Sequence, residues 1–240
     1  MNVLIMSDIH GNLSALEKIL EKVKQYDIQG CILLGDVIDY GVHSNEVAEC
    51  LQNLKYPILC NIWGNHEDAV VNNNYERFSS DRGRQSAKNT RQCLTTGTFD
   101  YLSDMENTGK IEFMCGEKRC LAIHGSVGDA YWNSITPEQE LAEYRPYDFV
   151  FSGHSHRPHF FEKFYDSDDV KRRNKKKTIF INPGSVGQPR NLNPMAQAVL
   201  LNTETEEMAF LKASYDIKKE QDAFTGQVDP FYRDRLEYGV

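Results

Sequence analysis

The stretch Ile5-Met6-Ser7-Asp8-Ile9-His10-Gly11-Asn12 ends an apolar run and places two potential metal ligands directly after it. Residues 2–6 are too few for a helix, and their continuous apolar character predicts a buried strand of an α/β sheet. Because residues i and i+2 of an extended chain point to the same side, Asp8 and His10 should converge. A strand-end Asp also commonly caps the following helix, so this stretch alone leaves both roles open for Asp8.

Composition is that of an ordinary globular chain: 240 residues, 40% hydrophobic, 26% charged, with a net charge of −8. This length suits one large α/β domain. No apolar run approaches the roughly 20 residues of a membrane span and no signal-peptide pattern is present, so we expect a cytoplasmic protein. The negative charge argues against stable nucleic-acid or membrane binding. The six cysteines form no C-x-x-C pair and are expected to be reduced thiols.

Short apolar runs alternate with helical spacing along the first 60 residues, which predicts a doubly wound β-α-β-α-β series. Strands are expected at 2–6, 30–34 and 57–60, with helices from Leu13 and at about 43–53. A polar excursion at about 68–108 should form a helical, cap-like segment, with helices near 84–95 and 98–104. Further strands are expected at 110–115, 118–124, 148–152, 158–165, 177–181, 196–202 and 207–213, with a helix near 136–144 and a short one in the C-terminal part, 214–240.

A strongly charged tip lies between two of these strands, from Asp166 to Lys177. Its basic residues, among them Arg172 and Arg173, would suit a nucleic-acid patch. A solvated hairpin tip is the favoured interpretation, because no aromatic residues interleave with the charges and acidic residues precede them.

Polar clusters follow five of the expected strands. In a parallel-type sheet these strand ends meet at one edge, where α/β proteins build their sites. Mixed imidazole and carboxylate ligands suit Mn, Fe or Zn, and a central carboxylate can bridge two ions about 3.5–4 Å apart. Two such ions would attract phosphate and lower the pKa of bound water. The clusters are Asp8/His10, Asp36/Asp39, Asn65/His66, His124 and His154/His156.

The order and spacing of these motifs resemble the calcineurin-like metallophosphoesterases. The motifs are Asp8-x-His10, Gly35-Asp36-x-x-Asp39-x-Gly41, Gly64-Asn65-His66-Glu67, His124-Gly125 and Gly153-His154-Ser155-His156. The resemblance spans residues 2 to about 190 and is closest to the small prokaryotic phosphodiesterase and diadenosine-polyphosphate hydrolase branch. It implies a four-layer αββα sandwich, with two mixed sheets packed face to face and helices outside.

The resemblance also implies residue roles. Asp8, His10 and His156 would hold one metal, Asp36 would bridge, and Asn65, His124 and His154 would hold the other. His66 would act as a general acid. Asp39 would orient a ligand or its loop, or else cap the following helix.

The function implied is hydrolysis of phosphodiesters or nucleotide polyphosphates, such as diadenosine tetraphosphate, through a metal-bound hydroxide. The alternatives are a catalytically silent scaffold and a phosphomonoesterase or protein phosphatase of the same fold. The partner is then a small phosphoester or nucleotide, and a homo-oligomer is possible. Arg190, Arg84 and Arg91 are candidate phosphate-binding residues, with an ordinary solvated surface as the alternative for each.

Overall fold

The computed structural model describes residues 1–171 and 175–240, which contain two five-stranded mixed sheets. The first sheet has the order β10-β9-β1-β2-β3. Strands β1 to β3 are parallel, and β9 and β10 complete the sheet in antiparallel pairing. Its members are β1 (Asn2–Met6), β2 (Gly30–Leu33), β3 (Ile58–Asn61), β9 (Ala196–Asn202) and β10 (Met208–Ala213).

The second sheet has the order β4-β5-β6-β8-β7, in which β5, β6 and β8 run parallel and the two outer strands antiparallel. Its members are β4 (Lys110–Cys115), β5 (Lys118–Ile123), β6 (Phe149–Ser152), β7 (His159–Phe164) and β8 (Lys177–Asn182). All ten predicted strands are therefore present, with ends within one residue of the predicted positions.

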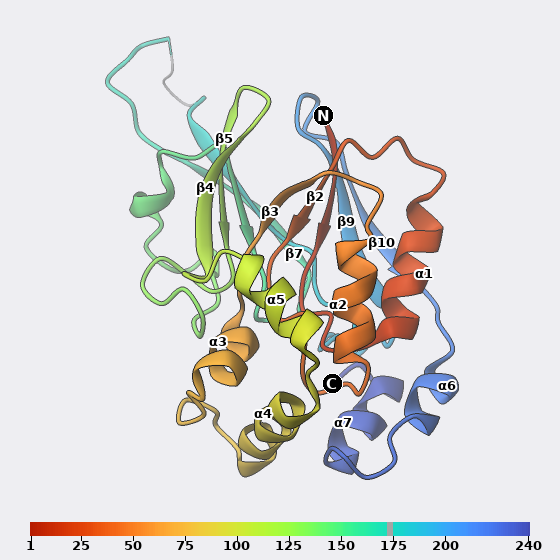
Figure 1. Ribbon diagram of the computed structural model, residues 1–240. Helices are drawn as coiled ribbons and strands as arrows, with labels where there is room; N and C mark the ends of the chain where they lie inside the picture. The colour runs from red at the N-terminus through yellow and green to blue at the C-terminus, as the bar shows by residue number, and fades with distance from the viewer. Residues whose placement is uncertain (172–174) are drawn as a thin grey trace.

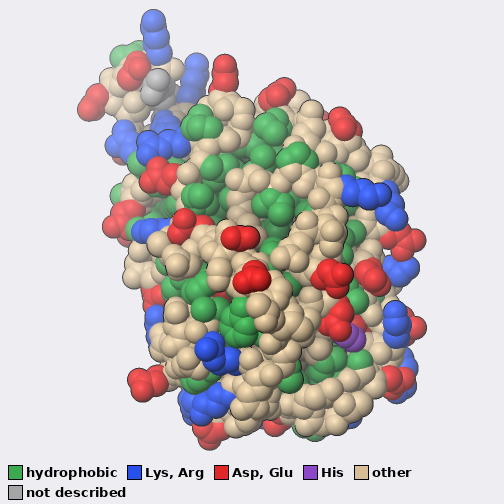
Figure 2. Space-filling view, viewed as in Figure 1, with side chains coloured by type: hydrophobic (Ala, Val, Ile, Leu, Met, Phe, Trp, Pro, Cys, Tyr) green, Lys and Arg blue, Asp and Glu red, His purple; other side chains and the backbone are tan. Residues whose placement is uncertain are grey.

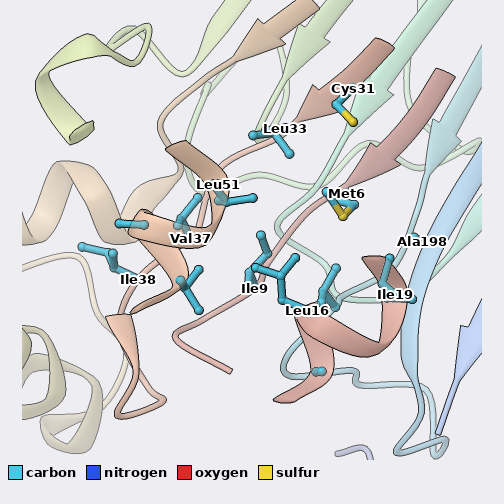
Figure 3. Close-up of a cluster of buried hydrophobic side chains, with 14 of the residues drawn as sticks. Met6, Ile9, Leu16, Ile19, Cys31, Leu33, Val37, Ile38, Leu51 and Ala198 are labelled. Carbon is cyan, nitrogen blue, oxygen red and sulfur yellow. The ribbon is translucent and has the colours of Figure 1, made fainter. Parts of the chain in front are cut away.

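The two sheets pack face to face through alternate residues of their strands. Val3 and Ile5 of β1 belong to a buried cluster with Phe149 and Phe151 of β6. The intervening residues Leu4 and Met6 point the other way, toward the helices. Figure 3 shows this second cluster, which includes Met6, Ile9, Leu16, Ile19 and Leu51. The predicted class, two mixed sheets sandwiched between outer layers, is confirmed.

Helices cover the outer face of the first sheet and gather beyond its lower end (Figure 1). Helices α1 (Leu13–Val23), α2 (Ser44–Gln52) and α5 (Thr96–Asp104) contribute to the cluster against that face. The side chain of Asn12 caps α1 by accepting a hydrogen bond from the backbone N–H of Ala15, at 3.0 Å. The remaining helices are α3 (Asn65–Asn72), α4 (Asp81–Cys93), α6 (Ile217–Asp222) and α7 (Pro230–Asp234).

The helix predicted near 136–144 is wrong. An irregular segment packs on the outer face of the second sheet in its place. Only the 3₁₀ turn η1 (Ala142–Tyr144) forms there. Gln139 Oε1 accepts from the backbone N–H of Thr136, as in a helix start, but its amide also donates to the Ser134 carbonyl and no helix follows. Ile135, Leu141 and Tyr144 pack on this sheet from an irregular segment, since their spacing does not form one helical stripe.

The described parts of the charged tip, 166–171 and 175–177, lie at the end of the molecule opposite α3 and α4 (Figure 1). Lys and Arg side chains gather around it in Figure 2. The predicted basic residues Arg172 and Arg173 lie outside the described residues. In the ranges 1–171 and 175–240, no helix is long and apolar enough to span a membrane.

Candidate metal centre

The loops that follow the strands adopt a backbone that non-glycine residues rarely use. Asp8, His10 and Asp36 have φ of 53°, 50° and 53°, and His154 and His156 have φ of 63° and 55°. A left-handed residue of this kind costs on the order of 1–3 kcal/mol, so the surrounding structure must hold it in place. These five residues follow strands of both sheets, and their shared strain makes the place where they meet the candidate functional site.

Glu67 holds the loop after β2, and sequence reasoning did not single it out. Its fully buried carboxylate accepts from the backbone N–H groups of Gly64 (2.7 Å), Asp36 (2.8 Å) and Val37 (2.8 Å). Gly35, at φ 85°, approaches so closely that a Cβ there would lie 2.2 Å from the Gly64 nitrogen. A Glu at the third helical position is a capping pattern that could have revealed this role.

The first candidate metal group contains Asp8, His10, Asp36 and His156, all buried and with ligand atoms within 4.8 Å of one another. His156 Nε2 lies 3.2 Å from Asp8 Oδ1, and His10 Nε2 lies 3.5 Å from Asp36 Oδ2. The two Nε2 atoms of His10 and His156 are 3.2 Å apart. Asn12 caps α1, so Asp8 does not serve as its helix cap.

The second group contains Asp36, His124 and His154, with Asn65 beside them. His124 Nε2 lies 3.4 Å from Asp36 Oδ2 and 3.1 Å from Asn65 Oδ1. Asn65 Oδ1 also lies 3.0 Å from His154 Nδ1. Asp36 is therefore common to both groups, at the place expected of a bridging carboxylate.

Backbone carbonyls set the tautomers of three of these histidines. The Nδ1 atoms of His10, His124 and His156 lie 3.2, 2.6 and 2.6 Å from the carbonyls of Ile38, Leu34 and Gln188. An Nδ1–H donated to a carbonyl leaves Nε2 as the lone-pair nitrogen that binds a metal. Facing lone pairs repel each other, so the short contact between His10 and His156 favours a cation between them.

The carboxylates are equally suited to a cation. Both oxygens of Asp8 and Oδ2 of Asp36 are buried and accept no hydrogen bond among the described residues. A buried carboxylate oxygen with no partner costs several kcal/mol unless a charge compensates it. The donor set of imidazole, carboxylate and amide oxygen suits divalent Mn, Fe or Zn. The residues present thus fit a divalent metal centre.

Electrostatics of the site follow from burial. Burial raises the pKa of Asp8 to about 7 and lowers the pKa of His154 to about 3. Burial also lowers the pKa values of His10 and His156 well below the usual histidine range. Burial opposes a charged His124 too, but the Asp36 carboxylate raises its pKa to about 9. The protein therefore favours a positive charge at His124, and a bound metal ion would replace that proton.

His66 stands beside the groups without belonging to either. Its Nδ1 lies 2.7 Å from Asp39 Oδ2, and its backbone N–H donates to Asp36 Oδ1 at 2.9 Å. The hydroxyls of Ser86 and Thr90 donate to the other Asp39 oxygen, at 2.6 and 2.7 Å. Burial opposes the charged imidazole, but Asp36 and Asp39 together raise the pKa of His66.

The alternative role for Asp39 is a helix cap. His43 occupies the N-cap position of α2, with no side-chain cap hydrogen bond, and Asp39 lies outside that position. The Asp39 carboxylate instead links the His66 imidazole to α4 through Ser86 and Thr90.

A cavity of about 230 Å³ opens above Asp36, Asn65 and His66. Arg190 lines it, and the Arg190 Nε is buried without a hydrogen-bond partner among the described residues. His154 and His156 line it as well. No site role was predicted from the sequence for the rest of the lining residues. They are Tyr40, Arg77, Phe78, Ser79, Ser80 and Trp132.

Arg84 and Arg91 do not line this cavity. The Arg84 guanidinium binds the carbonyl of Phe78 and the carboxylate of Asp81. The Arg91 guanidinium binds the carbonyls of Val70 and Val71 at the end of α3. Both cations are therefore occupied in holding the helical excursion together, and the structure does not bring them to the candidate site.

Comparisons with known proteins agree with this geometry. A family model described as the calcineurin-like phosphoesterase superfamily domain matches residues 1–206. The uncharacterized protein MJ0912 of Methanocaldococcus jannaschii is 26% identical over 227 residues, covering 90% of this chain and 89% of that protein. The crystal structure of a metallophosphoesterase from Sphaerobacter thermophilus has a TM-score of 0.78 and 25% identity, with both chains covered completely. Phosphodiesterase YfcE of Escherichia coli is 32% identical over 78 residues, which cover 29% of this chain and 42% of YfcE.

Proposed function

We propose that this chain, which belongs to the calcineurin-like phosphoesterase superfamily, hydrolyses phosphodiesters with the help of two divalent metal ions. The observation that carries the proposal is the pair of ligand groups that share Asp36. Asp8, His10 and His156 would complete one site, and Asn65, His124 and His154 the other. Ions held there would supply positive charge to a phosphate and lower the pKa of bound water.

Side chains of the protein would supply the proton and orient the phosphate. His66, held by Asp39 at 2.7 Å, is placed to deliver a proton to the leaving oxygen of the ester. The Asp36 and Asp39 carboxylates raise the pKa of His66, which favours the protonated ring. Arg190 would bind a non-bridging phosphate oxygen from the cavity wall.

Cavity charge and size favour a phosphodiester over a long polyphosphate. Of the two arginines that line the cavity, Arg77 is paired with Asp129. No carboxylate pairs with Arg190 in the ranges that the structure describes. One available cation and about 230 Å³ suit a singly charged diester with a moderate substituent. The similarity of 78 residues to YfcE, a phosphodiesterase, supports the same choice.

The catalytically silent scaffold is the weaker candidate. A protein that had lost catalysis would no longer need buried carboxylate oxygens without partners, since each of them destabilises the metal-free fold. The presence of such oxygens on Asp8 and Asp36 therefore favours a working metal centre.

A metal-by-substrate panel tests the proposal. The full chain, stripped with a chelator and reloaded with Mn²⁺, Fe²⁺ or Zn²⁺, is assayed on bis(p-nitrophenyl) phosphate, p-nitrophenyl phosphate and diadenosine tetraphosphate. We expect turnover that requires metal and is fastest for the diester. Arg84→Ala serves as the matched control for Arg190→Ala, since only Arg190 lines the cavity. Stoichiometric metal binding without turnover of any ester would overturn the proposal in favour of a scaffold.

A further inference from the structure

A C-terminal segment outside the family match forms part of the wall behind the candidate site. The match ends at residue 206, whereas α7 and the 3₁₀ turn η2 (Arg235–Glu237) lie near α4, beyond the lower end of the first sheet (Figure 1). Building on the proposed function, we infer that Tyr232 of this segment is a positioning residue. It holds Tyr40 against the imidazole of His66 and thereby fixes the direction in which that ring presents its Nε2.

Ring geometry carries the inference. Tyr232 is 3% exposed, and its ring stacks on Tyr40 with centroids 4.2 Å apart and an interplanar angle of 17°. Tyr40 in turn meets His66 edge-on, with centroids 4.3 Å apart and an angle of 70°. Phe78 contacts His66 as well, at 5.0 Å and 69°. Tyr40 and Phe78 thus both constrain the His66 ring, and Tyr232 supports the closer of the two.

Tyr40 needs that support because its backbone is unfavourable. Its φ is 62°, and the preceding Asp39 has φ 71°. Two successive left-handed residues without glycine persist only where packing holds them. The hydrogen bond that His66 Nδ1 donates to Asp39 fixes one nitrogen of the ring. Ring contacts with Tyr40, Phe78 and His10 limit its tilt. Tyr40 makes the shortest of these contacts, and the Tyr232 ring keeps Tyr40 in place.

The segment is itself tied to the elements around the site. The side-chain amide of Gln188 donates to the backbone carbonyl of Tyr232 at 3.4 Å. The backbone carbonyl of Gln188 lies 2.6 Å from Nδ1 of His156. Asn89 of α4 donates to the Gln227 carbonyl at 2.7 Å, and the guanidinium of Arg82 lies 4.2 Å above the Phe231 ring. Tyr232 is therefore held from two sides and transmits its position to Tyr40.

The test compares leaving groups. In the Mn²⁺-loaded full chain, Tyr232→Ala should lower kcat about 10- to 100-fold for an alkyl phosphodiester, the scale expected for a small misplacement. The loss should be several-fold smaller for bis(p-nitrophenyl) phosphate, whose leaving group hardly needs a proton. Tyr232→Phe, which keeps the stacked ring, should recover most of the loss. Tyr238→Ala is the control from the same segment, because the Tyr238 side chain is 62% exposed.

A second readout needs neither metal nor turnover. The ring-proton signals of His66 in the metal-free protein should shift in Tyr232→Ala, because the ring current of Tyr40 changes with its position. They should stay in place in Tyr238→Ala. If Tyr232→Ala does not fold, Tyr232→Leu replaces it in both measurements. Equal losses on both leaving groups, or unmoved His66 signals, would overturn the positioning role. Absent turnover by the wild type would instead refute the proposed function, and the His66 signals would still decide the role of Tyr232.

Discussion

The two candidate metal groups share Asp36 but differ in their access to solvent. Asp8, His10 and His156 of the first group are at most 1% exposed. His154 of the second group is only partly buried, and both His154 and His156 line the cavity. An ion in the second group would therefore be more exposed to solvent than one in the first. The difference teaches that the two proposed sites should bind and exchange metal unequally, although their donors are similar.

Removal of the shared charge should have the largest effect. Asp36→Asn removes the negative charge that both groups share, so elemental analysis should find both ions depleted. Activity should fall by more than the roughly 100-fold that loss of a supporting residue causes. Asp216→Asn is the matched control, because Asn caps a helix as well as Asp does and residue 216 caps α6. Wild-type occupancy in Asp36→Asn would disprove a bridging role.

Loss of His66 should affect chemistry without affecting either ion. His66→Ala should keep both metals and lose about 10²- to 10⁴-fold in kcat, the range for a general acid. The loss should shrink for nitrophenolate leaving groups. Steady-state kinetics with metal analysis on the same samples measures both effects. A loss that is the same for good and poor leaving groups would mean that His66 binds phosphate rather than donating a proton.

The inequality between the groups can be tested directly. A chelator should remove the ion of the more exposed group first, so wild-type protein should pass through a state with about half its metal. His154→Ala should retain the ion of the first group and bind the other at least about tenfold more weakly. Competition with a fluorescent chelator measures both. Simultaneous loss of the two ions at every chelator concentration would show that the groups are equivalent.

Arg91 of the excursion should matter for stability alone. Arg91 donates to the carbonyls of Val70 and Val71, so Arg91→Ala should lower the free energy of unfolding by about 1–2 kcal/mol. Its kcat/KM should stay at the wild-type value, whereas Arg190→Ala should raise KM. Urea unfolding and diester kinetics separate these outcomes. A selective loss of activity in Arg91→Ala would place this residue back in the substrate site.

The smallest effect should come from His43, which lies outside both groups. Its hydrogen bond to Glu220, at 2.8 Å, raises the pKa of His43 in the folded protein. The pair therefore contributes full stability below the ordinary histidine pKa of 6.5, and this contribution is lost as the pH rises through the raised value. Because the pair is partly exposed, His43→Gln should cost at most about 1 kcal/mol near pH 5.5 and almost nothing near pH 9. Urea unfolding at both values tests the sign, and a larger cost at high pH would contradict it.

The sequence predicted the sheets well because the signal there is local. Runs such as Val3–Met6 are continuously apolar, and this pattern requires burial whatever surrounds it. The polar clusters after these strands, including Asp36 and His124, were recognised for the same reason. The helix expected at 136–144 failed because proline and acidic residues resemble a helix start, while packing on the second sheet determined the real path.

Residues that act through distant contacts escaped sequence reasoning. Trp132 and Tyr232 reach the site or its wall from segments with no motif. Arg84 and Arg91 had the charge that a phosphate site needs, but sequence could not show that backbone carbonyls already occupy them. Whether a cation is free or occupied depends on tertiary contacts, which a linear pattern does not contain.

Placement of the ligand groups on both sheets has a consequence for folding. Asp8, His10 and Asp36 follow strands of the first sheet, whereas His124, His154 and His156 follow strands of the second. The centre can therefore form only after the chain from residue 8 to residue 156 has closed on itself. Metal would therefore bind late in folding and would cross-link the two sheets. Unfolding of the metal-loaded protein would then require both sheets to separate in one step.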